Sequence, residues 1–147
     1  MKLIDTTDER LYTTANKIDN VKSLSVKLLK EKLIKSLHQE DCISLSACQL
    51  GRSEAMFVMY SKNRLITCIN PEILWESKDT ISTKEHCASF PKLSIDLARP
   101  KKIIVRYTNT KGDSITETLE GIDARYFQHE LDHLNGITFI HRQNGKV

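Results

Sequence analysis

Two histidines and a glutamate lie within the short segment His129-Glu130-Leu131-Asp132-His133. In a helix, His129 and His133 are one turn apart, so both imidazoles leave the same face. Two such imidazoles can bind one metal ion, and Glu130 then lies beside a water on that ion. A surface helix that carries two histidines and two acids by chance is the alternative interpretation. The segment taken alone leaves both open.

Two histidines are too few for a catalytic metal site, which usually takes three ligands from the protein. Thermolysin-like proteases use a glutamate well downstream, but only fourteen residues follow His133, and none is Glu or Asp. The metzincin pattern HExxHxxGxxH matches Gly136, but Phe139 occupies its last position and His141 comes two residues late. Both protease interpretations fail, so we look for the third ligand upstream.

Cys87 is the best candidate for that ligand, because a thiolate binds soft and borderline divalent ions strongly. A buried structural cysteine is the alternative. The other cysteines are Cys42, Cys48 and Cys68, and none has a CxxC partner. This spacing argues against a redox pair or a zinc knuckle.

The elements that must hold these residues follow from the hydrophobic pattern. Apolar residues at helical spacing among lysines predict an amphipathic helix from Ser23 to His38. Strands are predicted at 55–60 and 65–69, joined as a hairpin, with Asn70-Pro71 breaking the chain before a short strand at 72–75.

Two further strands are predicted at 103–105 and 115–119, around a turn at 109–113. Gly121 should then open the histidine-bearing helix, and Gly136 should close it as a C-cap. This helix also carries an apolar stripe, which predicts a central position. The fold class is therefore α+β: antiparallel or mixed sheets packed around a central HExxH-bearing helix, with an N-terminal amphipathic helix.

Length and composition predict one domain over residues 1–147. The chain is 28% charged and 39% hydrophobic, as is typical of globular proteins, and its net charge of +3 is too small to indicate a nucleic-acid site. Residues 1–5 already include a lysine and an aspartate, so they do not begin an apolar signal segment. No apolar run in the sequence is long enough to span a bilayer. We therefore expect a cytoplasmic protein without a membrane partner.

Three motifs together resemble those of peptide deformylases, GφGφAAxQ, EGCφS and QHExDH. Residues 42–49 read Cys-Ile-Ser-Leu-Ser-Ala-Cys-Gln, residues 85–89 read Glu-His-Cys-Ala-Ser, and residues 128–133 read Gln-His-Glu-Leu-Asp-His. The order and spacing agree with that family over nearly the whole chain. The resemblance implies a hydrolase that removes the N-formyl group from the first methionine of newly made polypeptides.

The departures from these motifs lie where glycine is usual: Cys42, Ser44 and His86 replace it. Glycine often marks a close backbone approach, so substrate fit is in more doubt than metal binding. The rival function is a catalytically weak, metal-binding relative with altered peptide docking. The chain also resembles short forms that lack a C-terminal helical extension, such as those of some phages.

The resemblance also implies roles for individual residues. Cys87, His129 and His133 would hold one divalent ion, most often Fe²⁺, although Zn²⁺, Ni²⁺ and Co²⁺ suit the same ligands. Glu130 would move the proton. The side chain of Gln49 and the backbone N–H of Ala88 would stabilise the oxyanion.

Around them, Glu85 and Arg99 would form a bracing pair, while Asp132 either orients its neighbours or is solvated. The residues expected to bind substrate are Ile43, Ser44, Ile122, Arg125 and Tyr126. For Arg125, the stem would line the methionine pocket and the guanidinium would reach solvent at its rim; pointing away or pairing with an acid is the alternative.

The expected partners are N-formylmethionyl nascent peptides, with a transient ribosome association. We expect a monomer, in a bacterial or phage-infected bacterial cell.

Overall fold

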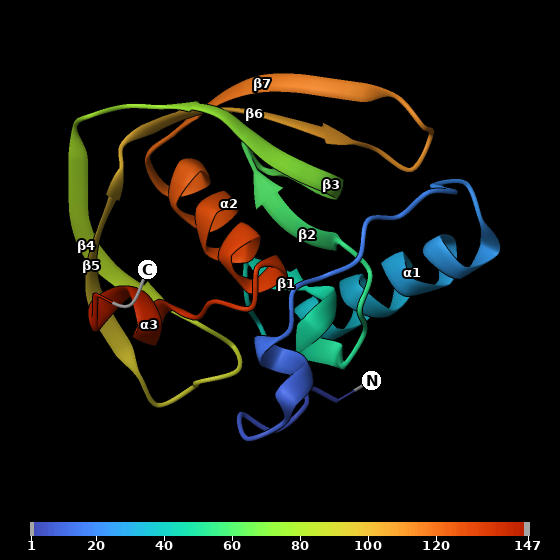
Figure 1. The fold of residues 1–147 in the computed structure, drawn as a ribbon, viewed down its shortest axis with the longest axis horizontal. Helices are drawn as coiled ribbons and strands as arrows, with labels where there is room; N and C mark the ends of the chain where they lie inside the picture. The colour runs from blue at the N-terminus through green and yellow to red at the C-terminus, as the bar shows by residue number, and fades with distance from the viewer. Residues whose placement is uncertain (1, 146–147) are drawn as a thin grey trace.

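The computed structural model describes residues 2–145 and has an α+β fold, which confirms the predicted class. Figure 1 shows a helix at its centre, between a large sheet and a two-stranded one. The helices are α1 (Leu24–Gln39), α2 (Gly121–Leu134) and α3 (Phe139–Gln143). The strands are β1 (Ser44–Ser46), β2 (Met56–Ser61), β3 (Arg64–Glu76), β4 (Thr80–His86), β5 (Ser94–Pro100), β6 (Lys102–Thr108) and β7 (Ser114–Glu120). Two short 3₁₀ helices cover Glu9–Tyr12 and Ala47–Leu50.

The larger sheet has the strand order β1-β2-β3-β6-β7, and each neighbouring pair is antiparallel. Its strand β2 is buried on both faces, because successive side chains alternate between two cores. Phe57 and Met59 belong to the core that contains Phe127 of α2. Met56 and Val58 pack in the core beneath α1. The sheet therefore separates the two long helices.

Helix α1 begins where its N-cap predicts. The hydroxyl of Ser23 accepts a hydrogen bond from the backbone N–H of Val26, which satisfies one of the free donors of the first turn. Leu29, Leu33 and Leu37 are fully buried on one face. Among the described residues, no helix is long and apolar enough to cross a membrane.

The predicted break at Asn70-Pro71 is wrong, because β3 runs unbroken from Arg64 to Glu76. The pairing of β3 with β6 shifts register between Ile69 and Glu72, so the strand absorbs the irregularity as a bulge. Asn70 adopts a positive φ of 50°, and its side-chain amide binds the backbone N–H and C=O of Ile18. These two bonds stabilise the conformation that the strand needs there.

Strands β4 and β5 form a separate two-stranded sheet that the hydrophobic pattern did not predict. Only Glu85 is buried along β4. The strand therefore lacks the alternation of buried apolar and exposed polar residues from which a strand is predicted. This hairpin positions the candidate site, because its first strand ends directly before Cys87 and its second strand carries Arg99.

Helix α2 ends at Leu134, with Asn135 as its cap and Gly136 following at φ 74°. A Cβ at position 136 would lie only 2.5 Å from the carbonyl oxygen of Tyr12. Glycine is needed here both for the left-handed backbone and for this close approach. The N-terminal segment is thereby packed against the end of the histidine-bearing helix.

Candidate active site

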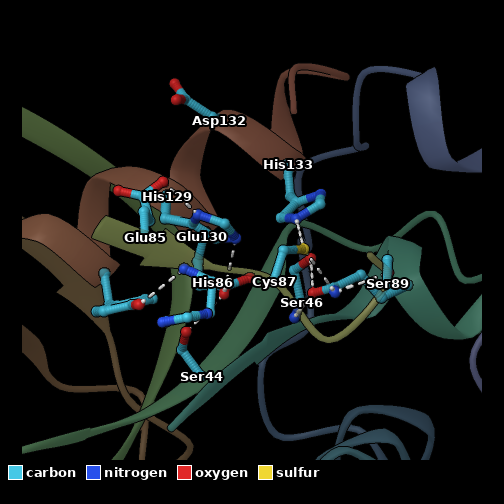
Figure 2. Close-up of polar contacts among 12 residues, drawn as sticks. Ser44, Ser46, Glu85, His86, Cys87, Ser89, His129, Glu130, Asp132 and His133 are labelled. Carbon is cyan, nitrogen blue, oxygen red and sulfur yellow. Dashed lines mark hydrogen bonds and ion pairs between the residues drawn. The ribbon is translucent and has the colours of Figure 1, made fainter. Parts of the chain in front are cut away.

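Three metal-ligating side chains meet in the interior between α2 and the β4–β5 hairpin. His129 and His133 project from the same face of α2, and Cys87 directly follows β4. One ligand atom from each residue lies within 4.8 Å of the other two, and all three residues are buried. Figure 2 shows the sulfur of Cys87 facing the ring of His133, and Sγ is 3.4 Å from Nε2. A thiolate and two imidazoles fit a divalent catalytic ion and leave a fourth position for water.

Glu85 orients His129 within this cluster. Oε2 of Glu85 lies 2.7 Å from Nδ1 of His129, which leaves Nε2 to bind a metal. Burial opposes protonation of His129, but contacts with Cys87 and Glu85 outweigh it and raise its pKa to about 10. Cys87 and Glu85 thus place negative charge beside His129, which favours a bound cation.

Glu85 is in turn held by a bidentate ion pair with Arg99. Nε and Nη2 of Arg99 lie 2.7 and 2.8 Å from the two carboxylate oxygens of Glu85. Burial disfavours the ionised carboxylate, but hydrogen bonds from Arg99 and His129 more than compensate and hold the pKa of Glu85 well below its usual range. The structure therefore brings together the two residues that were expected to brace the site.

Asp132 takes part in the same network and is not solvated. Only 5% of it is exposed, and it accepts hydrogen bonds from Arg99 and from Arg142 of α3. In Figure 2 its carboxylate points away from Cys87. Asp132 therefore links α2, β5 and α3 behind the ligand cluster. Arg142 was not identified from the sequence, because no local pattern connects it to this acid.

Glu130 lies on the cavity side of the histidines. It is almost completely buried, and its Oε2 accepts a hydrogen bond of 2.6 Å from the hydroxyl of Ser44. Its Oε1 has no hydrogen-bond partner among the described residues. Burial raises the pKa of Glu130. A carboxylate with a raised pKa and one free oxygen is suited to accept a proton near neutral pH.

Gln49 lies in the short 3₁₀ helix that directly follows β1, beside Cys87. Its Oε1 accepts from the backbone N–H of Ser46 at 2.9 Å, and its Nε2 donates to the hydroxyl of Ser89 at 2.9 Å. Nε2 also lies 3.7 Å from Sγ of Cys87. The amide nitrogen therefore faces the reaction site, with its orientation set by two serines that the sequence did not single out.

A cavity of about 400 Å³ opens onto these groups. Cys87, His129 and Glu130 line it, together with Ala88, whose backbone N–H was expected to assist Gln49. Three of the expected substrate-binding residues line it as well: Ile43, Ser44 and Tyr126. The other lining residues were not expected to bind substrate: Glu40, Asp41, Cys42, His86, Phe90, Pro91 and Leu93.

The structure does not bring the other two expected substrate residues to this cavity. Ile122 is 64% exposed and lies outside it. The prediction that the guanidinium of Arg125 reaches solvent at a pocket rim is wrong, because only 6% of this residue is exposed. It donates instead to Oε1 of Glu85 at 3.0 Å and to the carbonyl of Ile81 at 2.6 Å. The buried negative charge of Glu85 offers the guanidinium a better partner than water does.

Comparison with known proteins agrees with this geometry. A family model described as polypeptide deformylase matches residues 1–147. A peptide deformylase of Thermotoga petrophila is 46% identical over 112 residues, covering 76% of this chain and 68% of its own. That of Aquifex aeolicus is 35% identical over 144 residues, covering 94% and 84%.

Solved structures give the same result. The crystal structure of peptide deformylase from Thermotoga maritima superposes with a TM-score of 0.92 at 38% identity, covering 96% of this chain and 95% of its own. A Synechococcus elongatus peptide deformylase solved in complex with actinonin gives a TM-score of 0.91 at 28% identity, covering 96% and 77%. The resemblance seen in the three sequence motifs is confirmed, and the chain belongs to the polypeptide deformylase family.

Proposed function

We propose that this protein is a metal-dependent hydrolase that removes the N-formyl group from the N-terminal methionine of newly made polypeptides. One domain over residues 1–147 would carry the whole activity. The observation that supports this most strongly is the position of Glu130 beside the cluster of Cys87, His129 and His133: its Oε2 lies 3.9 Å from Nε2 of His129, and its Oε1 has no partner among the described residues. Family membership gives the same reaction.

The reaction adds water across the formyl C–N bond and yields formate and a free amine. A bound divalent ion would supply Lewis acidity and would lower the pKa of a water toward about 7. Glu130 takes the proton from the attacking water on its free Oε1 and passes it to the amine nitrogen as that group leaves. Its amide variant could not accept this proton.

The tetrahedral carbon carries an oxyanion, which needs hydrogen-bond donors. One hydrogen of the Gln49 amide is donated to Ser89 and the other to Sγ of Cys87, so the second must turn from the sulfur to the substrate oxygen during the reaction. The backbone N–H of Ala88, on the cavity wall beside Cys87, is the proposed second donor. Each such donor lowers the barrier by roughly 3 kcal/mol.

Ferrous iron is the proposed native ion, because the mixed thiolate and imidazole donors suit a borderline divalent metal. Zinc, nickel and cobalt suit the same donors. Ile43 and Tyr126 are the proposed contacts of the formylmethionyl peptide, since they line the cavity next to the cluster. Ser44 lines the same cavity, but its hydroxyl is already bonded to Glu130. We further propose that the protein is a monomer that acts in the bacterial cytoplasm. A brief association with the ribosome is proposed because formylated nascent chains emerge from the ribosome.

Formate release from formyl-Met-Ala-Ser tests the proposal, with metal content measured on the same sample. We expect the wild type to release formate, and Glu130→Gln to keep its metal and its melting temperature while kcat falls by about 10²- to 10⁴-fold. A metal-loaded wild type that releases no formate would instead identify a metal-binding relative that has lost the activity. Near-normal turnover by metal-loaded Glu130→Gln would refute the role of Glu130.

A further inference from the structure

Two serine hydroxyls lie on one face of β1, on the side of the reaction site. Ser44 and Ser46 are two residues apart, so both side chains leave the same face of the strand, whereas Leu45 between them packs in the core beneath α1. Both serines are buried, at 6% and 0% exposed. Both also stand where the family motif has glycine or alanine, residues without a hydroxyl. Figure 2 shows the two serines next to the ligand cluster.

Ser44 holds the proton-accepting carboxylate. Its hydroxyl donates to Oε2 of Glu130 at 2.6 Å, in the range of strong charge-assisted O–H···O⁻ bonds. Oε2 of Glu130 also lies 3.9 Å from Nε2 of His129, which gives no comparable hydrogen bond. The Ser44 bond occupies Oε2, and both Ser44 and Ser46 act on the carboxylate against the effect of burial, which raises the pKa of Glu130. The other oxygen, Oε1, has no partner among the described residues.

Ser46 acts in the same way on the amide of Gln49. Its hydroxyl lies 3.1 Å from Oε1 of Gln49, and its backbone N–H donates to the same atom at 2.9 Å. Both donors fix the amide oxygen, so the amide nitrogen must face Ser89 and the sulfur of Cys87. The backbone donor would persist in the absence of the Ser46 hydroxyl. The orientation of Gln49 therefore depends less on the hydroxyl of Ser46 than the orientation of Glu130 depends on that of Ser44.

We propose that the hydroxyls of Ser44 and Ser46 are a positioning pair for the deformylation reaction. Ser44 sets the carboxylate of Glu130, and Ser46 sets the amide of Gln49. The inference rests on the proposed function. Neither hydroxyl touches the reacting atoms; each acts by holding a catalytic side chain in its productive orientation before substrate binds. The barrier to reaction therefore depends on these hydroxyls, while the affinity for the peptide does not.

The decisive comparison is between Ser44→Thr and Ser44→Val. The two variants have nearly the same shape and suit a strand equally, but only threonine keeps a hydroxyl. We expect Ser44→Thr to retain most of the wild-type kcat. Ser44→Val should lower kcat by about 10- to 100-fold, equivalent to about 1.4 to 2.7 kcal/mol, with KM within two-fold of wild type. Ser44→Ala serves as the smaller second variant if valine disturbs folding. Ser46→Ala should lower kcat less than Ser44→Ala does.

Ser61→Ala is the matched control. Ser61 is a buried strand serine whose hydroxyl also bonds a carboxylate of α2, Asp123 at 3.1 Å, but at the far end of the helix from the site. Its loss should lower the melting temperature as much as Ser44→Ala does, and leave kcat unchanged. An equal loss of kcat in Ser61→Ala and Ser44→Ala would reduce Ser44 to a structural role.

A second readout does not depend on turnover. In cobalt-loaded protein, the visible d–d bands report the arrangement around the ion, next to which Glu130 lies. The bands of Ser44→Thr should match the wild type, and those of Ser44→Val should shift. Identical bands and identical kcat in both variants would overturn the inference. If the wild type releases no formate, the proposed function fails, and the band comparison alone then decides whether Ser44 positions Glu130.

Discussion

Arg125 and Glu85 form an ion pair in the interior of the protein, with Nη1 of the arginine 3.0 Å from Oε1 of the glutamate. The same carboxylate already binds Arg99 through both its oxygens and His129 through one. One buried carboxylate thus joins α2 to both strands of the β4–β5 hairpin. Arg99 also donates to Asp132, so two buried carboxylates, Glu85 and Asp132, share the three guanidinium groups of Arg99, Arg125 and Arg142.

We expect Arg125→Ile to affect stability and not substrate binding. Arg99 still neutralises Glu85 in this variant, so the cost is the two hydrogen bonds of Arg125, to Glu85 and to Ile81. The isoleucine that replaces a buried charge offsets part of it, which leaves roughly 1.5–3 kcal/mol in the free energy of unfolding. KM for neutral and for acidic formyl-Met peptides should not change, because Arg125 lies outside the cavity. Urea denaturation and steady-state kinetics measure both. The control is Arg64→Ile, which removes an exposed pair with Glu117 and should cost about 1 kcal/mol or less. A changed KM in Arg125→Ile would restore the substrate role.

Glu85→Gln should be much more harmful than Arg125→Ile. It leaves Arg125 buried without a counter-charge and Arg99 with Asp132 alone, and breaking a buried ion pair in this way typically destabilises a protein by about 3–5 kcal/mol. It also weakens the bond that orients His129, so metal affinity should fall by about 10- to 100-fold. Chemical denaturation and competition with a chelator test the two effects. Glu72→Gln, which disrupts a half-exposed pair with Arg106, is the control and should change neither. Wild-type metal affinity in Glu85→Gln would contradict the orienting role.

Cys87→Ser should lose most of the bound metal, whereas Cys68→Ser should retain it. Both cysteines are buried and free, so the two substitutions make a similar steric change. Only Cys87 lies with His129 and His133, and an alcohol is a far weaker ligand than a thiolate. Metal analysis after gel filtration distinguishes the two. Equal metal content in wild type and Cys87→Ser would remove Cys87 from the ligand set.

Iron-loaded protein should lose activity in air within the time of an assay, and nickel- or cobalt-loaded protein should survive. The thiolate of Cys87 and ferrous iron are both oxidisable, so oxygen attacks the site at two points. Activity followed with and without oxygen, on samples loaded with each metal, checks this. Equal half-lives of the iron form in both atmospheres would count against iron as the native ion.

Local patterns predicted the parts of the fold that carry a periodic hydrophobic signal. Helix α1 lies within one residue of its expected limits, because Ser23 caps it and leucines recur on one face. Strand β4 went unpredicted because its only buried residue is the charged Glu85. Strand β5 was missed although Ile95 and Leu97 alternate with exposed residues, because its third inward residue is the charged Arg99 and the strand ends at Pro100. Asn70 misled the prediction, since its side chain supplies the bonds that let the strand continue.

In the candidate site too, local spacing predicted some residues, while contacts between distant parts of the sequence were not predicted. Helical spacing alone placed His129 and His133 on one face, and ligand chemistry singled out Cys87, which the structure places beside them. The same spacing put Arg125 on the correct side of α2, but its partner could not be predicted, because Glu85 lies 40 residues away. Ser44 was noticed as a departure from glycine. Its bond to Glu130 needed the three-dimensional structure.

The long sequence separations within the site also bear on how it forms and how it is lost. Ser44 and Glu130 are 86 residues apart, and Glu85 and His129 are 44 apart. Contacts of this range carry a loop-closure cost that is recovered only when the surrounding chain is ordered. No short contiguous fragment of the protein contains both of these residue pairs. The catalytic arrangement should therefore appear late in folding and vanish in one cooperative step with the tertiary structure, so that enzymatic activity serves as a direct gauge of the native population.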